Sequence, residues 1–231
     1  MTSHSCEQPP ELIKARKICQ VCMARNPGKI HSGASFEFDP DVISYWSQWL
    51  GHPRPHILMV GQDFGDVGYF ERNRGKDNAE NKTNDNLYEL LTHIGLKPTR
   101  PPRPDLETRV YLTNSILCLK NPPMDKTISV SWVRNCAVTH LRPLAKELKP
   151  HIVVAMGASG WLAALHAFEI ECAPKKITVA AGGSWLTRIG IQVFAVGHCG
   201  PKGKINRSWD KQLEDWSRIG NALRLVEQVS D

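Results

Sequence analysis

The sequence has no long apolar run, since no stretch approaches the roughly 20 residues that span a bilayer. The opening residues, MTSHSCEQPPELIKARK, lack the apolar segment of a signal peptide. The chain also lacks internal repeats and low-complexity tails. We therefore expect a soluble, intracellular protein of the cytoplasm with no membrane partner.

Charge of one sign is only modestly in excess. Lys plus Arg number 29 against 23 Asp plus Glu, which gives a net charge of +6 and a pI near 9.0. Such an excess favours an anionic partner, of which nucleic acid is the commonest, without proving one. The chain has 231 residues, 41% of them hydrophobic. It can bury a sizeable core, and its length predicts one domain over 1–231.

Short apolar segments alternate with helical patterns along the chain. Four continuous apolar runs are typical of strands buried on both faces, and they lie at 56–61, 110–115, 151–157 and 193–199. Helical spacing of apolar residues is found at 84–95, 131–148, 158–168 and 208–228. This order predicts a three-layer α/β/α sandwich around a central, mainly parallel four-stranded sheet. The proline-rich segment 97–109 is expected to be an extended surface connection.

Polar residues follow three of the predicted strands. Gln62 and Asp63 come after the first strand, Asn114 ends the second, and His198 lies at the end of the fourth. Ligands of open α/β sheets bind beyond the carboxyl ends of the strands, so we expect these side chains to form a site. Taken singly, each has an ordinary alternative, because Asp in a glycine-containing turn and Asn at a strand end are common turn formers.

Seven cysteines are present, and four of them have spacings that suit a metal site. Cys19 and Cys22 form a Cys-x2-Cys pair, and seventeen residues separate Cys118 from Cys136. In a reducing compartment, such a set is more often metal-binding than disulfide-bonded. A tetrahedral zinc ion and an iron–sulfur cluster both fit this spacing, and the alternative is that Cys118 and Cys136 are apolar core residues. The remaining three thiols, Cys6, Cys172 and Cys199, have no paired spacing.

From Cys19 to Trp216, the ordered motifs resemble the uracil-DNA glycosylase superfamily, most closely its family-four iron–sulfur branch. The motifs are CQVC, the loop GQDFG after the first strand, TNSILC, Cys136, and GHCGPKGKINRSW after the last strand. The resemblance implies a structural 4Fe-4S cluster held by Cys19, Cys22, Cys118 and Cys136. It also implies a monofunctional uracil-DNA glycosylase that needs no diffusible cofactor.

The first loop departs from the family-four pattern. Gln62 and Asp63 replace the Glu and Ala of that branch and resemble the GQDPY loop of family one, where the aspartate positions or activates water. The tyrosine that crowds uracil C5 in family one is replaced by Gly65, so exclusion of thymine must come from elsewhere or be incomplete. After His198, the loop is longer and more basic than in family four.

The resemblance implies a role for each candidate residue in the recognition and release of uracil. Uracil flipped out of DNA presents an N3 donor and an O4 acceptor, and the Asn114 carboxamide offers the complementary acceptor and donor. Cytosine has the reverse pattern, so its hydrogen bonds to Asn114 would be left unmade. Asp63 and His198 are the predicted catalytic residues: Asp63 faces the sugar cation and a water, while His198 donates to uracil O2. Gln62 is expected to contact the substrate. Phe70 is favoured over Phe64 and Tyr69 as the aromatic platform for the base, although core packing is expected for at least one of the three.

The segment PKGKINR, 201–207, places three cations around one isoleucine. Lys202, Lys204 and Arg207 are predicted to hold phosphates while Ile205 fills the gap left by the flipped base. The alternative is a solvated loop with a buried isoleucine anchor.

The expected partner is uracil-containing DNA, single- or double-stranded, and we expect a monomer. Three other functions remain open: a damage-binding or abasic-site-trapping module, a glycosylase for hypoxanthine or xanthine, and a nucleotide-binding α/β protein with structural zinc.

Overall fold

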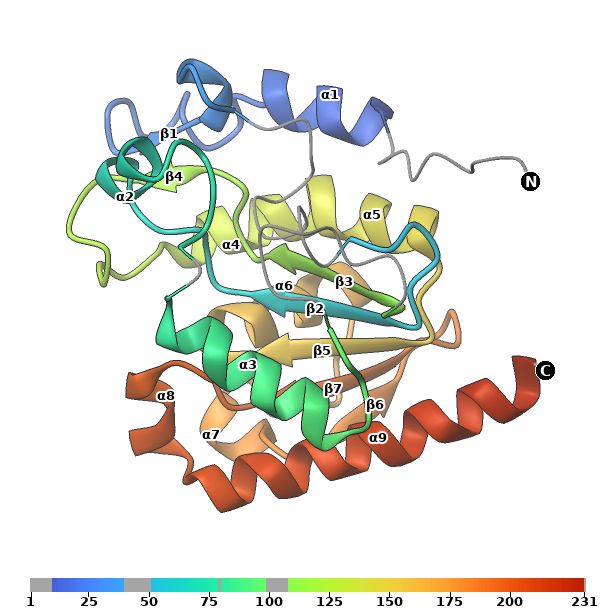
Figure 1. The fold of residues 1–231 in the computed structure, drawn as a ribbon. Coiled ribbons are helices and arrows are strands. Elements are labelled where there is room, and N and C mark those ends of the chain that lie inside the picture. The colour runs from blue at the N-terminus through green and yellow to red at the C-terminus, as the bar shows by residue number, and fades with distance from the viewer. Residues whose placement is uncertain (1–9, 40–50, 79, 99–107, 231) are drawn as a thin grey trace, which may run out of the picture.

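The structure is a computed structural model that describes residues 10–39, 51–78, 80–98 and 108–230 (Figure 1). Its centre is a five-stranded sheet with the strand order β3-β2-β5-β7-β6. Four strands are parallel: β2 (Ile57–Gly61), β3 (Val110–Asn114), β5 (Ile152–Met156) and β7 (Gln192–Val196). These are the four predicted strands, so the predicted mainly parallel α/β fold is confirmed.

The fifth strand, β6 (Ser184–Leu186), pairs antiparallel with β7 at the edge of the sheet and was not predicted. It has only three residues, and Ser184 and Leu186 are exposed. A strand this short has neither an apolar run nor a visible alternation, because only its middle residue packs inward. It therefore lacks the pattern by which the other strands were found.

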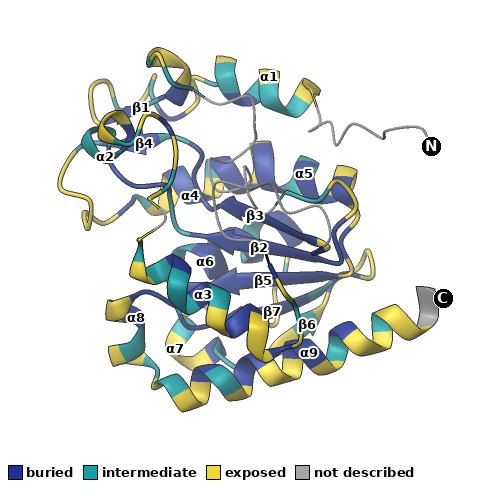
Figure 2. Ribbon diagram, in the orientation of Figure 1, coloured by how far each residue is buried: buried dark blue, intermediate teal, exposed yellow. Residues whose placement is uncertain are grey.

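Alternate residues of each parallel strand pack on opposite faces of the sheet, which makes two hydrophobic cores. One core lies under α4 (Val130–Cys136), α5 (Arg142–Leu148) and α6 (Gly157–Phe168). The other lies under α3 (Lys82–His93) and α9 (Trp209–Ser230) (Figure 1). The four parallel strands are buried almost throughout, as Figure 2 shows, so the α/β/α layering is confirmed.

The predicted helix at 131–148 is interrupted. A π-helical turn, Ala137–Leu141, lies between α4 and α5, so the segment is two α-helices joined through one wide turn. The apolar spacing continues across this turn, because Ala137 and Leu141 are both buried. Periodicity therefore did not reveal the break.

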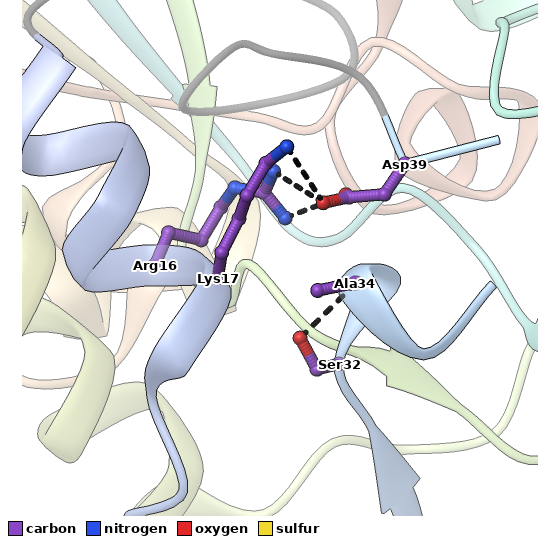
Figure 3. A network of polar contacts seen from close by, with 5 residues as sticks. All are labelled: Arg16, Lys17, Ser32, Ala34 and Asp39. Atoms are coloured by element: carbon purple, nitrogen blue, oxygen red, sulfur yellow. Dashed lines mark hydrogen bonds and ion pairs between the residues drawn. The ribbon is translucent and has the colours of Figure 1, made fainter. Parts of the chain in front are cut away.

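The amino-terminal segment pairs with β4 (Leu119–Lys120), the strand that follows β3 in the sequence. It contains α1 (Pro10–Ile18) and β1 (Ile30–His31), and β1 pairs antiparallel with β4. Arg16 on α1 forms a two-bond ion pair with Asp39 at 2.8 and 3.0 Å, and Lys17 adds a contact to Asp39 at 3.7 Å (Figure 3). Ser32 caps a short 3-10 helix, Gly33–Ser35, through the Ala34 N–H. These contacts fix the path of the segment beside β4.

Three short helices complete the described part of the chain: α2 (Val67–Arg72), α7 (Ile177–Ala180) and α8 (Pro201–Asn206). None of the described helices is long and apolar enough to span a bilayer. Most of the predicted extended connection at 97–109 lies outside the described residues, as does Cys6. The single domain over 1–231 stays a prediction.

Candidate active site

The carboxyl ends of the parallel strands meet at the edge of the sheet where α2 and α8 lie (Figure 1). Gly61 and Asn114 are register partners at the ends of β2 and β3, and Gln62 and Asp63 follow directly. The Gln62 side chain reaches the helix that follows β5, since Ser159 Oγ of α6 lies 3.5 Å from Gln62 Oε1. The residues predicted from strand ends are thus placed along one edge of the sheet.

Asp63 forms an ion pair with Lys120, which the sequence did not single out. Lys120 Nζ lies 2.7 Å from Asp63 Oδ2, and the two side chains are 1% and 7% exposed. Gln62 Nε2 donates to the same oxygen at 3.3 Å. Burial raises the pKa of the Asp63 carboxyl from its usual value, and the Lys120 ammonium opposes that rise. A lysine at the end of a short apolar segment, LCLK, was the one signal available for this residue.

The Asn114 side chain is held against the end of β2. It is buried, and a Cβ atom at Gly61 would lie 2.8 Å from Asn114 Oδ1, so the carboxamide depends on glycine at that position. The next residue, Ser115, donates its hydroxyl to Gln62 O at 2.5 Å and its N–H to Gly61 O at 2.8 Å. These bonds fasten the end of β3 to the first loop and fix where Asn114 lies.

His198 has one ring nitrogen engaged by the backbone. The Gly200 N–H donates to His198 Nδ1 at 2.9 Å, so in the neutral ring the proton is on Nε2. Burial lowers the pKa of the imidazole, which favours this neutral form. Asn86 of α3 donates to Cys199 O at 2.6 Å and holds the loop. The neutral His198 ring therefore carries a donor, Nε2–H, on the side opposite the Gly200 bond.

Two glycines allow the backbone to close around His198. A Cβ at Gly203 would lie 1.8 Å from His198 O, and Gly157 has φ +69 with the imidazole 3.4 Å from its Cβ position. Any larger residue at 203 would displace the histidine loop or α8. Beside His198 a cavity opens that is lined by Gly157, Ala158, Ile177, Thr178, Ala181, Gly197, Gly203, Asn206 and Arg207.

Phe70 is completely buried in α2. Its ring packs edge-on against Phe36 and Phe64, with centroids 5.6 and 5.8 Å away. This placement corresponds to core packing, the alternative weighed for the three aromatic residues of the loop. Tyr69 is partly exposed, and its hydroxyl donates to Asp77 at 2.6 Å.

The basic segment forms α8 and ends at Arg207. Ile205 is 85% exposed, so it is not the buried anchor of the alternative interpretation. Lys202 is exposed and reaches Asp125 at 2.9 Å, and Lys204 Nζ lies 3.8 Å from the centre of the Trp209 ring. The fourth residue, Arg207, differs from the other three because its guanidinium makes two bonds to Asp215, at 2.5 and 2.6 Å.

The four cysteines of the predicted metal site line one cavity. Cys19 and Cys22 come from the loop between α1 and β1, Cys118 precedes β4, and Cys136 ends α4. Two N–H groups point at sulfurs: Leu117 N lies 3.4 Å from Cys136 Sγ, and Asn135 Nδ2 lies 3.6 Å from Cys22 Sγ. Such bonds to sulfur are typical of sites that hold thiolates.

Burial raises the pKa values of three of these thiols, Cys22, Cys118 and Cys136, and that of Cys118 reaches about 12. Neighbouring cysteines of the set add to the rise at Cys118 and Cys136. A cation bound among them would reverse this effect, because metal binding releases the thiol protons. The four thiols are the residue type that holds a metal-bound group, but no three His, Cys, Asp or Glu side chains of the described residues are grouped so as to hold one ion.

The family model described as the uracil DNA glycosylase superfamily matches residues 49–219. That range includes all of the predicted site residues except Cys19 and Cys22. A search of curated proteins found no match.

Proposed function

Because the chain belongs to the uracil DNA glycosylase superfamily, we propose that this DNA glycosylase flips uracil out of DNA and hydrolyses its N-glycosidic bond. One observation carries the proposal: the carboxyl ends of β2, β3 and β7 present a carboxylate, a carboxamide and a neutral imidazole at one edge of the sheet. Hydrolysis builds positive charge on the sugar and negative charge on the departing base. The site offers a group of suitable charge or polarity for each.

Asn114 is proposed to read the base. Its carboxamide offers an acceptor for uracil N3–H and a donor for O4, and its contact with Gly61 restrains the side chain. Cytosine has the reverse pattern, so its hydrogen bonds would be left unmade at about 1–3 kcal/mol each. Preference for uracil over cytosine follows from this mismatch.

Asp63 is proposed to stabilise the sugar cation and to orient the attacking water. Lys120 and Gln62 both donate to Oδ2, which leaves Oδ1 of the carboxylate as the acceptor for water. A carboxylate held in this way stabilises charge that develops only as the bond breaks.

His198 is proposed to stabilise the leaving base. Its Nε2–H can donate to uracil O2 as the anion forms, and no proton transfer is required because a neutral donor suffices. The cavity beside His198 is lined in part by Ile177 of α7 and Asn206 of α8, and neighbouring DNA atoms are proposed to approach from that side.

The aromatic platform is proposed to involve Phe64 with Phe70 beneath it. Phe64 follows Asp63 directly and is 6% exposed, whereas Phe70 would have to leave its packing to stack on a base. The edge-on contact between the two rings, 5.8 Å between centroids, would support Phe64 from below.

Contact with DNA is proposed for α8. Exposed Ile205 is suited to fill the gap left by the flipped base, and Lys202 and Lys204 lie on the same short helix to meet phosphates. We place Arg207 in support of this helix, because its bonds to Asp215 join the end of α8 to α9.

A structural 4Fe-4S cluster is proposed at Cys19, Cys22, Cys118 and Cys136, as in the family-four branch. Among the described residues, no three His, Cys, Asp or Glu side chains lie close enough to share one metal ion. What supports the proposal is the donor set, since all four cysteines line one cavity and N–H groups lie near the sulfurs of Cys22 and Cys136. Zinc would use the same four thiolates, so the metal content of the purified protein decides between the two. When bound, the cluster would join the amino-terminal segment to β4 and α4.

Base release from single-lesion oligonucleotides tests the proposed function. The panel contains uracil, thymine, hypoxanthine and xanthine, each in single- and double-stranded DNA. We expect release of uracil, and we expect Asn114→Asp to lower it because a carboxylate offers no donor for O4 and repels the uracil anion. Release of hypoxanthine or xanthine alone would overturn the uracil assignment, and a persistent protein–DNA adduct without turnover would indicate a trapping module.

A further inference from the structure

We propose that Lys120 is a positioning residue for hydrolysis, which keeps Asp63 ionised and turned so that one carboxylate oxygen faces the substrate. The inference rests on the proposed function of Asp63 as the group that faces the sugar and the water. It adds a residue that acts through Asp63 without touching the DNA.

The geometry joins Lys120 to one oxygen only. Lys120 Nζ lies 2.7 Å from Asp63 Oδ2, and Gln62 Nε2 reaches the same oxygen at 3.3 Å. Two donors on one oxygen restrain the rotation of the carboxyl group, since a quarter turn would break both bonds and a half turn only exchanges its two equivalent oxygens. The other oxygen, Oδ1, is thereby directed away from the lysine.

The burial of this pair requires an explanation other than stability. Lys120 is 1% exposed, and lysine is among the residues that are almost never fully buried unless paired. Desolvation of two ions offsets most of their attraction, so a buried ion pair is weak evidence for stabilisation. The buried ammonium therefore adds little to the stability of the fold. Its larger effect is to keep the Asp63 carboxylate charged in a position that holds little water.

The backbone of Lys120 is fixed on both sides. Ile30 of β1 is its antiparallel partner, and Asp66 forms an isolated bridge with it on the other side. Asp66 is also the amino-terminal cap of α2, where its Oδ1 accepts from the Tyr69 N–H at 2.7 Å. The lysine thus approaches Asp63 from a strand that is tied to the same loop, and a long flexible side chain is held to one target.

Three groups act on the charge of Asp63. Burial raises its pKa, the Lys120 ammonium and the Gln62 amide lower it, and the nearby Asp66 carboxylate raises it. Lys120 supplies the positive charge among them. Without Lys120, burial and Asp66 would still raise the pKa of Asp63, and only the Gln62 amide would lower it. The carboxyl group would then keep its proton to a higher pH.

The test measures single-turnover base release against pH for the wild type, Lys120→Met and Lys120→Arg, with the full chain. We expect the acid limb of the Lys120→Met profile to move upward by at least one pH unit, with an at least tenfold lower rate at pH 7 that recovers at higher pH. Lys120→Arg keeps the charge and should keep the acid limb within half a unit. The control is Lys126→Met, which removes an exposed lysine from the loop that follows β4 and should leave the profile unchanged.

Unfolding provides a readout that does not depend on activity. A carboxyl group whose folded pKa lies above its unfolded value loses stability as pH rises through that interval. As the pH rises from 4 to 8, the Tm of Lys120→Met should therefore fall more steeply than the Tm of the wild type. Asp63→Asn combined with Lys120→Met should remove this extra slope. Iron per chain is measured for each variant, because Cys118 lies two residues away.

The outcomes separate the inference from the proposed function. A wild type that releases no base from any lesion defeats the proposed function, and the unfolding slopes then decide whether Lys120 sets the charge of Asp63. A Lys120→Met profile with the wild-type acid limb and a rate within threefold would overturn the inference, as would equal unfolding slopes in the wild type and Lys120→Met.

Discussion

Replacing Arg207 by Met tests whether this residue contacts DNA or supports α8. The structure indicates support, because both Asp215 bonds, at 2.5 and 2.6 Å, engage the guanidinium and Asp215 is only 1% exposed. Removing one partner of a buried pair leaves an uncompensated charge, at about 3–5 kcal/mol. For a protein of this size each kcal/mol lowers Tm by about 2–4 °C. We therefore expect Arg207→Met to lower Tm by roughly 6–20 °C.

The matched control is Lys202→Met, in an ion pair of the same helix that is open to solvent. Lys202 and Asp125 are 80% and 64% exposed, so their contact contributes little to stability and Tm should hardly change. Binding to an abasic duplex is measured against salt concentration at a temperature below the melting range. In this assay Lys202→Met should change more than Arg207→Met. Loss of one phosphate contact reduces the salt slope by about one, which we expect for Lys202→Met and not for Arg207→Met.

The combined variant Arg207→Met with Asp215→Leu removes the stranded charge and should regain most of the lost Tm. A different result would refute the reasoning: Tm within 3 °C of the wild type together with a salt slope reduced by about one. Arg207 would then be a phosphate contact, as its place in the basic segment first indicated.

Four further outcomes are expected. Asp63→Asn should lower the single-turnover rate per folded molecule by roughly 10²–10⁴-fold, and it should also lower Tm because it leaves the Lys120 charge buried; near-wild-type turnover would remove Asp63 from catalysis. Cys136→Ser should reduce iron per chain and folded yield before it reduces turnover per folded molecule, and zinc without iron in the wild type would contradict the cluster. Ile205→Ala should slow uracil release from duplex DNA more than from single strands, whereas equal slowing would argue against a wedge. Burial lowers the pKa of His56 to about 4, so stability present above about pH 6.5 should be lost toward pH 4, and His56→Gln should flatten that loss in denaturant titrations.

The sheet and the edge that carries the site could be predicted because each depends on local pattern. Continuous apolar runs identify doubly buried strands, and parallel strands bring their carboxyl ends to one edge whatever the loops do. The place of Asp63 and Asn114 at this edge was therefore predictable from position alone, while their roles stay predictions. The same reasoning placed His198 at this edge without any knowledge of its tautomer.

Other features depend on partners that are distant in sequence. Lys120 meets Asp63 across 57 positions, and nothing in LCLK indicates which residue a buried ammonium will face. The basic segment around Arg207 looked uniform, yet Asp215 engages one of its three cations and leaves the others nearer the surface. Burial of Phe70 was set by Phe36, from a segment before the first predicted strand.

The pairing of β1 with β4 affects when the protein can assemble during synthesis. Asn135 and Cys22, which approach each other at the cysteine cavity, are 113 positions apart. At about 5–20 residues per second, a ribosome needs roughly 6–23 s to add that length. For most of this interval the thiols of Cys19 and Cys22 lack the two cysteines that share their cavity, and β1 lacks its partner strand. The amino-terminal segment can therefore take up its folded position only after the chain as far as α4 has been made.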